Sequence, residues 1–359
     1  MLYYLLYQHF GINVVRYITF RTAAASLTAL ALSLLLGPWM IRRLREFQIG
    51  QVVRTDVPKA HKAKSGTPTM GGILILTAVL LPTLLWADLT NAYVWIAMLA
   101  TAAFGAIGFV DDYLKVTRRS HYGLFARYKI LAQVAVGLAV GGSLMWMASQ
   151  TPSQYDTRLM VPFFKQWVPP LGWWYVPFAM FVLVSATNTV NLTDGLDGLA
   201  ASTFSVSAAT YTALTYVTSH YTIASYLLIQ PSAMAGELTI FCGTLVGASL
   251  GFLWWNAHPA EVFMGDVGSL GLGGALGTVA VLIRQELLLP IVGGVFVLEG
   301  ASVILQVASF KLTGKRIFRM SPLHHHFELV GWAEPKIIFR FLILAIIFAL
   351  MSLTTLKLR

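Results

Sequence analysis

Residues that could perform metal-dependent chemistry gather in short stretches between long apolar runs. Asp111 and Asp112 are adjacent at the end of one run, and Asp266 lies between two glycines at the start of another. Carboxylate oxygens are the ligands that Mg²⁺ prefers, usually together with water and substrate phosphates. Because a glycine turn lets a carboxylate approach a ligand closely, these residues predict a magnesium-dependent site.

A second polar stretch, residues 188–198 (NTVNLTDGLDG), contains Asn188, Asn191, Asp194 and Asp197. It has no Lys or Arg to neutralise the carboxylates, and its glycines allow turns and close approach to a ligand. These oxygen ligands again suit magnesium and phosphate groups. An ordinary polar turn is the alternative, whereas a calcium loop is disfavoured because the ligand pattern ending in Glu is absent.

The adjacent carboxylates of Asp111 and Asp112 need a compensating positive charge. If the helix ends at this pair, both side chains meet the negative end of its dipole. Lys115, one turn further on, is one candidate for the compensating group, and a bound divalent ion is another. Neighbouring helical residues point about 100° apart, so the two Asp residues are expected to have different roles. A solvated acidic pair is the alternative interpretation.

Residues 322–328 (PLHHHFE) contain three consecutive histidines, His324, His325 and His326. Consecutive side chains do not converge on one ion without a special backbone, and no cysteine assists, so zinc is the weaker interpretation. Three basic residues precede the histidines between positions 315 and 319. This combination favours phosphate binding and proton transfer near neutral pH.

Two further residues have open interpretations. Phe263 lies three positions before Asp266, where an exposed ring could stack on a planar base, although anchoring at the membrane interface explains it equally well. Glu299 is the one carboxylate deep within a predicted membrane span. Intramembrane ionisable groups are functional by default, but a structural acid bonded to a neighbouring helix is an equal alternative, so Glu299 is assigned no catalytic role.

The elements that position these residues are predicted to be membrane helices. Of 359 residues, 57% are hydrophobic and only 11% are charged, which excludes a soluble domain. The net charge of +10 does not indicate nucleic acid, because the basic residues lie in a few loops between apolar runs. We predict an all-α polytopic membrane protein forming one domain over residues 1–359, with residues 1–20 as an interfacial segment. Ten spans are expected near 22–40, 70–87, 93–110, 130–148, 172–188, 199–217, 237–255, 269–283, 287–308 and 337–355.

The distribution of Lys and Arg predicts the orientation of these spans. One alternating set of loops carries 17 Lys and Arg, and the other set, which includes both tails, carries 7. The positive-inside rule places the first set in the cytoplasm and both termini outside, in the periplasm. Lys64, Thr69 and all the polar stretches described above belong to the first set. We therefore expect an active-site cleft formed by cytoplasmic loops.

Five motifs carry a specific resemblance: PTMGGI (68–73), GFVDDYLK (108–115), NLTDGLDGLA (191–200), NAHPAEVFMGDVGSL (256–270) and PLHHHFEL (322–329). In this order they resemble the phospho-N-acetylmuramoyl-pentapeptide transferase family, within the superfamily of polyprenyl-phosphate N-acetylhexosamine-1-phosphate transferases. The resemblance covers essentially the whole chain. The superfamily shares the Asp motifs, so the histidine string with its following Glu determines the predicted sugar donor.

The resemblance implies a donor, UDP-N-acetylmuramoyl-pentapeptide, an acceptor, undecaprenyl phosphate, and the products lipid I and UMP. It implies Mg²⁺ as the cofactor, the bacterial inner membrane as the location, and the first membrane step of peptidoglycan synthesis. Membrane lipid is a further expected partner, a homodimer is left open, and no nucleic acid is expected.

The motifs also imply residue roles. Asp266 would be the principal magnesium ligand, and Asp111 the base or nucleophile with Asp112 beside it. Uridine would be held by Lys64, Asp197, Asn256 and Phe263, and the rest of the donor pocket would be lined by Asp194, Gln306, His324 and His325. The predicted site comprises catalytic Asp111, Asp112, Asp266 and His324, and substrate-binding Lys64, Thr69, Lys115, Asn188, Asn191, Asp194, Asp197, Asn256, Phe263, Gln306, His325 and His326.

The predicted reaction is phosphoryl transfer, in which a protein mainly positions groups and neutralises charge. Direct attack by the lipid phosphate is favoured over an aspartyl-phosphate intermediate, because a phosphate monoester with a second pKa of about 6 is already largely deprotonated at pH 7. Two other classes compete. A secondary transporter would place its polar groups near the bilayer midplane, and a membrane scaffold would leave the clustered Asp and His residues unexplained.

Overall fold

The computed structural model describes residues 1–47, 66–118, 123–151, 155–164 and 166–357. The described residues are helical apart from connecting segments and one isolated bridge between Arg158 and Pro170, which confirms the all-α class. The longer helices are α1 (Ile18–Glu46), α3 (Gly72–Trp86), α4 (Ala92–Thr117), α5 (Ala126–Gln150), α6 (Tyr175–Thr193), α7 (Leu199–Ser219), α9 (Ala235–Asn256), α10 (Gly265–Leu282), α12 (Gly294–Thr313) and α14 (Glu334–Thr355). Short elements are η1 (Tyr4–His9), η2 (Asn13–Arg16), η3 (Gly172–Trp174), α8 (Tyr221–Tyr226), α11 (Leu289–Val292) and α13 (Leu323–Val330).

Eight helices in the described part of the chain are long and apolar enough to cross a membrane: α1, α4, α5, α6 with η3, α9, α10, α12 and α14. The chain is therefore a multi-pass membrane protein. Each of the ten predicted spans overlaps one of the longer helices, but α3 and α7 are not among the eight. The number of ten spans consequently stays a prediction.

Length and composition explain these two exceptions. Helix α3 has 15 residues, short for a span of about 20 residues. Helix α7 is rich in Ser and Thr, and most of its residues are buried. Its hydroxyls donate to backbone carbonyls of the preceding turn, as Thr203 does to Leu199 and Thr215 does to Tyr211. A helix surrounded by protein does not need a lipid-compatible surface, so its lower apolar content fits an interior position.

Several helix ends differ from the predicted span boundaries. Helix α1 begins at Ile18 and continues past the apolar run into its basic end, because a helix can extend from the membrane into water. The predicted interfacial segment therefore contains the first turn of α1, after η1 and η2. The predicted span 287–308 is two helices, α11 and α12, which are separated at Gly293. Glycine has high conformational freedom, and hydropathy alone does not detect such an interruption.

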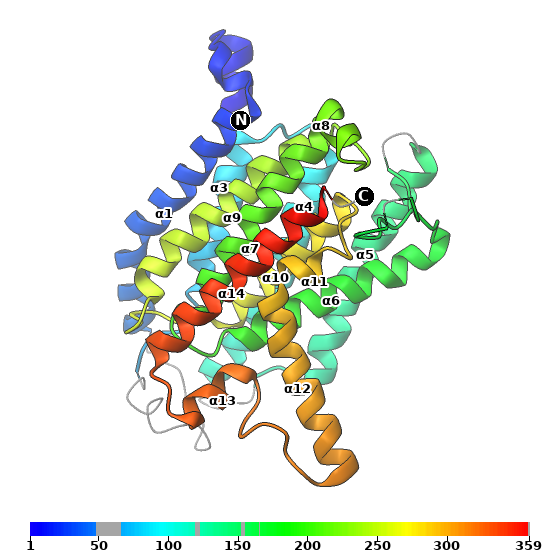
Figure 1. Cartoon of the computed structure of the whole chain (residues 1–359). Helices are drawn as coiled ribbons and strands as arrows, with labels where there is room; N and C mark the ends of the chain where they lie inside the picture. The colour runs from blue at the N-terminus through cyan, green and yellow to red at the C-terminus, as the bar shows by residue number, and fades with distance from the viewer. Residues whose placement is uncertain (48–65, 119–122, 152–154, 165, 358–359) are drawn as a thin grey trace.

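Helix α10 occupies the centre of the bundle, where most of its residues are buried. It packs against α3, α4, α6 and α7 (Figure 1). The N-terminal segment and the end of α14 lie at one end of the bundle, and α13 lies at the opposite end. Helix α12 leans away from the other helices toward the end that carries α13.

A separate apolar cluster holds α13 in place. Its buried members are Leu196, Leu199, Val295, Ile337, Phe341 and Ala345, and Leu323, Phe327 and Trp332 pack against them. The rings of Phe327 and Trp332 are stacked, with centroids 4.4 Å apart, and the Arg340 guanidinium lies over the Trp332 ring, 4.1 Å from its centroid. The helix with the three histidines is thus attached to α7, α12 and α14.

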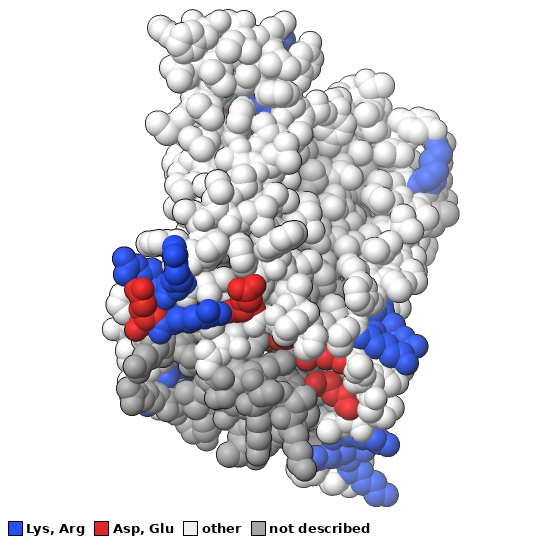
Figure 2. Space-filling view, turned by 90° about the vertical axis from the view of Figure 1, so that its left-hand side faces the viewer, with Lys and Arg blue, Asp and Glu red and all other residues white. Residues whose placement is uncertain are grey.

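Charged side chains are distributed unevenly over the surface. On the face in Figure 2, most Lys, Arg, Asp and Glu residues lie toward the end of the bundle that carries α13, and a broad region above them is almost without charge. Apolar side chains are widely exposed on the long helices, for example Leu35 at 76% and Ile304 at 70%. Such a surface suits contact with lipid rather than water.

Candidate active site

Asp111, Asp112 and Asp266 come together at the interface of α4 and α10. One oxygen of each carboxylate lies within 4.8 Å of an oxygen of the other two. Asp111 and Asp112 are each 3% exposed, and Asp266 is partly buried. We call these three residues the acidic triad. Three carboxylates held this closely require compensating positive charge.

Glycines allow the backbones that carry the acidic triad to approach. A Cβ on Gly108 of α4 would lie 2.1 Å from the carbonyl oxygen of Asp266, closer than any contact allows. A Cβ on Gly72 of α3 would similarly lie 2.0 Å from the backbone nitrogen of Gly268. The first turn of α10 is therefore seated directly on α3 and α4, one helical turn from Asp111 and Asp112.

Two ammonium groups neutralise most of the charge of the triad. Lys115 Nζ lies 2.6 Å from Asp111 Oδ2, 3.3 Å from Asp112 Oδ1 and 2.9 Å from Asp266 Oδ2. Lys129 Nζ, at the start of α5, lies 2.6 Å from Asp266 Oδ2 and 3.7 Å from Asp111 Oδ2. Lys115 was a predicted site residue. Lys129 was not predicted, because its position in a basic loop gave no sign of the contact.

The start of α10 supplies further stabilisation for two of the carboxylates. The backbone N–H of Val267 donates to Asp112 Oδ2 at 3.1 Å, which satisfies one of the free amides of the first turn. Asp266 itself lies in that first turn, at the positive end of the helix dipole. The expected unfavourable dipole at Asp111 and Asp112 is absent, because α4 continues to Thr117 and both residues lie inside the helix.

Amide groups fix the remaining oxygens of the triad. Asn191 Nδ2 donates to Asp266 Oδ1 and to Ser269 Oγ, at 2.8 Å in each case. The backbone N–H of Leu124 donates to Asp111 Oδ1 at 2.7 Å. Asn188, by contrast, donates to Gln133 Oε1 at 2.6 Å, and no contact with the triad is found for it in the described structure. Asn191 thus lies in the site with the acidic triad, whereas Asn188 joins α6 to α5.

The turn 194–198 lies beside the acidic triad. Burial, together with the nearby charges of Asp266, Asp112 and Asp197, raises the pKa of the Asp194 carboxyl to about 8. Asn256 joins this turn to the following loop, because its Oδ1 accepts from Gly198 N at 3.0 Å and its Nδ2 donates to Val262 O at 2.8 Å.

Asp197 forms a second acidic group with His258 and Glu334. Its Oδ2 lies 3.1 Å from His258 Nδ1 and accepts from the Ala260 N–H at 3.1 Å. The Asp197 N–H donates to Glu334 Oε1 at 2.9 Å. One atom of each member lies within 4.8 Å of the others, so the group also has the spacing of a metal site. These contacts hold the turn 194–198 against the start of α14.

Phe263 and Thr69 lie where the segment before α3 meets the segment before α10. The Phe263 N–H donates to Pro68 O, and Gly71 N–H donates back to Phe263 O at 2.9 Å. The Phe263 ring is partly exposed. A Cβ on Gly265 would lie 2.5 Å from Asp112 Oδ2 and 3.1 Å from Thr69 Oγ1, so Thr69 borders the acidic triad. Lys64 lies outside the described residues.

The three histidines each have a different partner. His324 Nδ1 lies 3.2 Å from Glu299 Oε2, and His325 Nδ1 lies 2.6 Å from Glu328 Oε2. His326 Nδ1 accepts the backbone N–H of Arg319 at 3.1 Å. This divergence agrees with the expectation that consecutive histidines do not share one ion. His324 is 1% exposed. Its ring faces Glu299, a residue to which the sequence alone assigned no catalytic role.

Gln306 is engaged within the protein. Its Oε1 accepts from the backbone of Ile317 and Phe318, and its Nε2 donates to Phe318 O at 3.0 Å. All its polar atoms therefore position the segment before α13. A donor contact predicted for Gln306 would have to replace one of these bonds.

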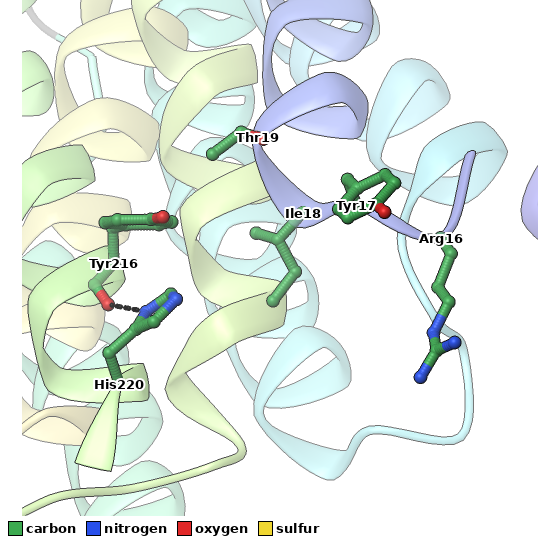
Figure 3. A pocket seen from close by; sticks show the side chains of 6 residues that line it. All are labelled: Arg16, Tyr17, Ile18, Thr19, Tyr216 and His220. Carbon is green, nitrogen blue, oxygen red and sulfur yellow. Dashed lines mark hydrogen bonds between the residues drawn. The ribbon is translucent and has the colours of Figure 1, made fainter. Parts of the chain in front are cut away.

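A pocket elsewhere in the bundle is separate from this site. Figure 3 shows that it is lined by Arg16, Tyr17, Ile18, Thr19, Tyr216 and His220, between the start of α1 and the end of α7. The site described above lies at the other end of α7, which is about 30 Å long. His220 Nδ1 lies 3.0 Å from Tyr216 O, and no predicted site residue lines the pocket.

Known proteins resemble this chain over its full length. A family model described as glycosyl transferase family 4 matches residues 94–284, and phospho-N-acetylmuramoyl-pentapeptide-transferase signature 1 matches residues 64–76. A phospho-N-acetylmuramoyl-pentapeptide-transferase from Koribacter versatilis is 58% identical, and one from Acidobacterium capsulatum is 57% identical, with 100% of each chain covered. A protein of the same name from Desulfatibacillum aliphaticivorans is 59% identical over 97% of this chain and 96% of its own.

Proposed function

This chain belongs to the phospho-N-acetylmuramoyl-pentapeptide-transferase family, and we propose that it transfers phospho-N-acetylmuramoyl-pentapeptide from UDP-N-acetylmuramoyl-pentapeptide to undecaprenyl phosphate. The products are lipid I and UMP, and the reaction is the first membrane step of peptidoglycan synthesis. The observation that carries the proposal is the acidic triad with its two lysines, placed at one end of a membrane bundle beside the turn 194–198.

The residues of the acidic triad fit a magnesium ion. They offer hard carboxylate oxygens within 4.8 Å of one another, and one of them, Asp266, lies in the first turn of α10. Three carboxylates and two ammonium groups leave a local excess of negative charge, which a divalent cation would reverse. Asp266 would be the principal ligand. When bound, the ion would neutralise diphosphate oxygens and ease the departure of UMP.

The protein's own groups would contribute position and charge. Lys115 and Lys129 present ammonium groups that can move from carboxylates to phosphate oxygens when the substrates enter. Asp111, fixed by the Leu124 N–H, would orient the acceptor phosphate, and Asp112 would hold the start of α10 in place. We favour direct attack by the acceptor phosphate, which with a second pKa of about 6 is already largely deprotonated at pH 7. Retention of phosphate on an aspartate after mixing enzyme with donor alone would contradict this mechanism.

We assign the donor to the region between the turn 194–198, Phe263 and α13. Asp197 and Phe263 are proposed to hold uridine, with Lys64 from outside the described residues. Asp194, His324 and His325 are proposed to line the remaining part of the pocket. The close packing of Leu196 with Leu323 and Phe327 in one apolar cluster supports this assignment, since it brings the turn and the histidines together. Asn256 and Gln306 would act by holding the pocket segments.

We propose an inner-membrane protein with ten spans, both termini in the periplasm and the acidic triad facing the cytoplasm. In this arrangement the two remaining spans would be α3, which is short, and α7, which is largely buried among its neighbours. The excess of Lys and Arg in the loops at the end of the bundle that carries α13 supports the orientation. A homodimer remains a hypothesis, which light scattering of the purified protein in detergent would test.

The proposed activity is tested by UMP release from purified protein in detergent. The assay contains undecaprenyl phosphate and magnesium, with either the muramoyl-pentapeptide donor or UDP-N-acetylglucosamine. We expect release with the muramoyl donor alone and no measurable release from Asp266→Asn. The matched control is Glu46→Gln, an exposed carboxylate in a surface ion pair, which should keep wild-type activity. UMP release with UDP-N-acetylglucosamine instead would overturn the donor assignment. The absence of UMP release with both donors would overturn the proposed transferase activity.

A further inference from the structure

Glu299 is buried in α12 at 0% exposure, and the described structure shows no Lys or Arg within ion-pair distance of it. The only described partner of its side chain is His324, which is itself 1% exposed. Glu299 Oε1 accepts the backbone N–H of His324 at 3.2 Å, and Oε2 lies 3.2 Å from the ring atom Nδ1. One carboxylate thus contacts both the backbone and the ring of the same histidine.

A buried carboxylate with one imidazole partner is costly compared with an apolar side chain of the same size. Stability alone therefore does not account for Glu299. The surrounding structure also keeps the pair in place, since Gly300 packs against Thr189 of α6 and Leu323 packs in the apolar cluster beside His324. The pair is held on a rigid support.

The other ring nitrogen of His324 is directed at the turn 194–198. A Cβ on Gly195 would lie 2.2 Å from His324 Nε2, so the ring closes on the backbone of this turn. Both ring nitrogens are buried, and neither makes a hydrogen bond to a described residue. They differ in what they face, because Nδ1 has a Glu299 carboxylate oxygen 3.2 Å away, whereas Nε2 has no ion-pair partner among the described residues. With Nδ1 facing Glu299, Nε2 is the atom that is free to bind a group entering beside Asp194.

We propose that Glu299 is a positioning residue for the transfer reaction. It fixes the rotation of the His324 ring and favours a proton on Nδ1, so that Nε2 is presented to an anionic or polar group of the donor at the turn 194–198. This inference rests on the proposed function, because it takes the donor to occupy that turn. It assigns a role to the intramembrane acid that the reaction scheme leaves unused.

The test is a double-mutant cycle with Glu299→Gln and His324→Ala, measured as kcat/KM for the donor. Glu299→Gln keeps the size of the side chain and an acceptor for the His324 N–H, and it should lower kcat/KM by about ten- to hundredfold. We expect a higher donor KM with the acceptor KM within about twofold, whereas a smaller active fraction would lower kcat alone. In the His324→Ala background, Glu299→Gln should lower kcat/KM by less than about twofold, because the ring that Glu299 positions is gone.

A second variant tests the ring position without changing Glu299. Gly195→Ala should displace the His324 ring and lower kcat/KM for the donor as Glu299→Gln does. In the His324→Ala background the added methyl group should no longer have this effect. Glu286→Gln, another buried carboxylate at the opposite end of the bundle, is the control and should retain activity within about twofold at pH 7. Thermal unfolding of each purified variant identifies misfolding.

The outcomes separate the two claims. An inactive wild-type protein would contradict the proposed function and this inference with it. An active wild type with a fully active Glu299→Gln, or with losses that multiply in the double variant, would overturn the positioning role alone. If Glu299→Gln does not fold, the Gly195→Ala cycle tests whether the ring position matters. Losses that multiply in the Gly195→Ala and His324→Ala double variant would show that it does not, and would overturn the positioning role.

Discussion

Lys115 and Lys129 hold three carboxylates together by ion pairs, as the distances between their ammonium nitrogens and the carboxylate oxygens show. Both ammonium groups lie within 3 Å of Asp266 Oδ2, so they share this oxygen. Each lysine also reaches Asp111, at 2.6 Å and 3.7 Å respectively. This sharing explains how the acidic triad can be buried, and it places two cations where phosphate groups would arrive.

Replacing Lys129 by Met should lower kcat/KM for the donor by about tenfold or more, because one preorganised positive charge is lost from the site. Arg127→Met is the matched control. Arg127 is exposed and lies over the ring of Tyr128, 4.8 Å from its centroid, so its loss should leave activity nearly unchanged. Steady-state UMP release measures both variants. Equal activity of the two variants would contradict the role of Lys129.

Glu286 gives a prediction on pH and stability. Burial raises the pKa of the Glu286 carboxyl to about 7, although it accepts a hydrogen bond from the Tyr175 hydroxyl. A raised folded-state pKa contributes stability below the unfolded value near 4.5, and this stability is lost as pH rises through about 7. We expect the melting temperature to fall between pH 5 and pH 8 and the fall to be smaller in Glu286→Gln, with each pH unit worth at most about 1.4 kcal/mol. Identical pH slopes would show that Glu286 does not titrate in this range.

At the scale of elements, the acidic triad depends on how closely α10 lies against α3 and α4. Gly108 and Gly72 allow this approach, and the first turn of α10 then meets Asp112 through the Val267 N–H. The carboxylates are thus placed by helix packing, although they are far apart in the sequence. A wider spacing between α10 and α4 should therefore lower the rate of UMP release even when every charged residue is kept.

Gly108→Ala tests this dependence. The added Cβ would lie 2.1 Å from a backbone oxygen of Asp266, so α10 must move away from α4. We expect a loss of activity of tenfold or more and a loss of stability of about 1–3 kcal/mol. Gly142→Ala in α5 is the control, because a Cβ there meets nothing within 4 Å and should be neutral or stabilising by about 0.5–1 kcal/mol. The rate of UMP release and the melting temperature distinguish the two variants.

The sequence predicted the local motifs of this site better than their contacts. Asp111, Asp112, Asp266 and Asn191 were identified because their spacing and neighbours are unusual. Lys129 was missed, since a basic residue in a basic loop is uninformative until α5 is placed beside α10. The partner of His324 was also missed, because the pairing of α12 with α13 joins residues 25 positions apart.

At the element level, the apolar runs located the longer helices but not their ends. The apolar run 287–308 concealed the break at Gly293, because hydropathy does not report backbone direction. Helix α7 shows the opposite case, since it was predicted as a span while its composition is that of an interior helix. Tertiary contacts determine both features, and one sequence does not contain them explicitly.

At the scale of the whole molecule, the arrangement separates two ends. The N-terminal segment and the end of α14 lie at one end, and α13 lies at the other (Figure 1). The turn 194–198 contacts α13 and the start of α14, and it lies beside the acidic triad, so these groups share the end that carries α13. An uncharged surface separates most of the charged residues from the opposite end on the face in Figure 2. A bundle of this kind can present one site to one side of a membrane.

The orientation is testable with single cysteines in a Cys242→Ser background, since Cys242 is the only cysteine in the chain. Lys315→Cys lies near α13 and Tyr221→Cys lies at the opposite end of α7, and both positions are exposed. In intact cells with a permeabilised outer membrane, an impermeant maleimide should label Tyr221→Cys alone. Labelling of Lys315→Cys instead would reverse the proposed orientation.

The proposed transfer is tested most directly by detecting its lipid product. Purified wild-type protein is incubated with UDP-N-acetylmuramoyl-pentapeptide, undecaprenyl phosphate and magnesium, and the extracted lipid is identified and quantified by mass spectrometry. We expect a lipid carrying a diphosphate and the muramoyl-pentapeptide, in equal amount to UMP, and none of it from Asp266→Asn. Unchanged undecaprenyl phosphate in the wild-type reaction, or equal product from Asp266→Asn, would contradict the proposed transfer.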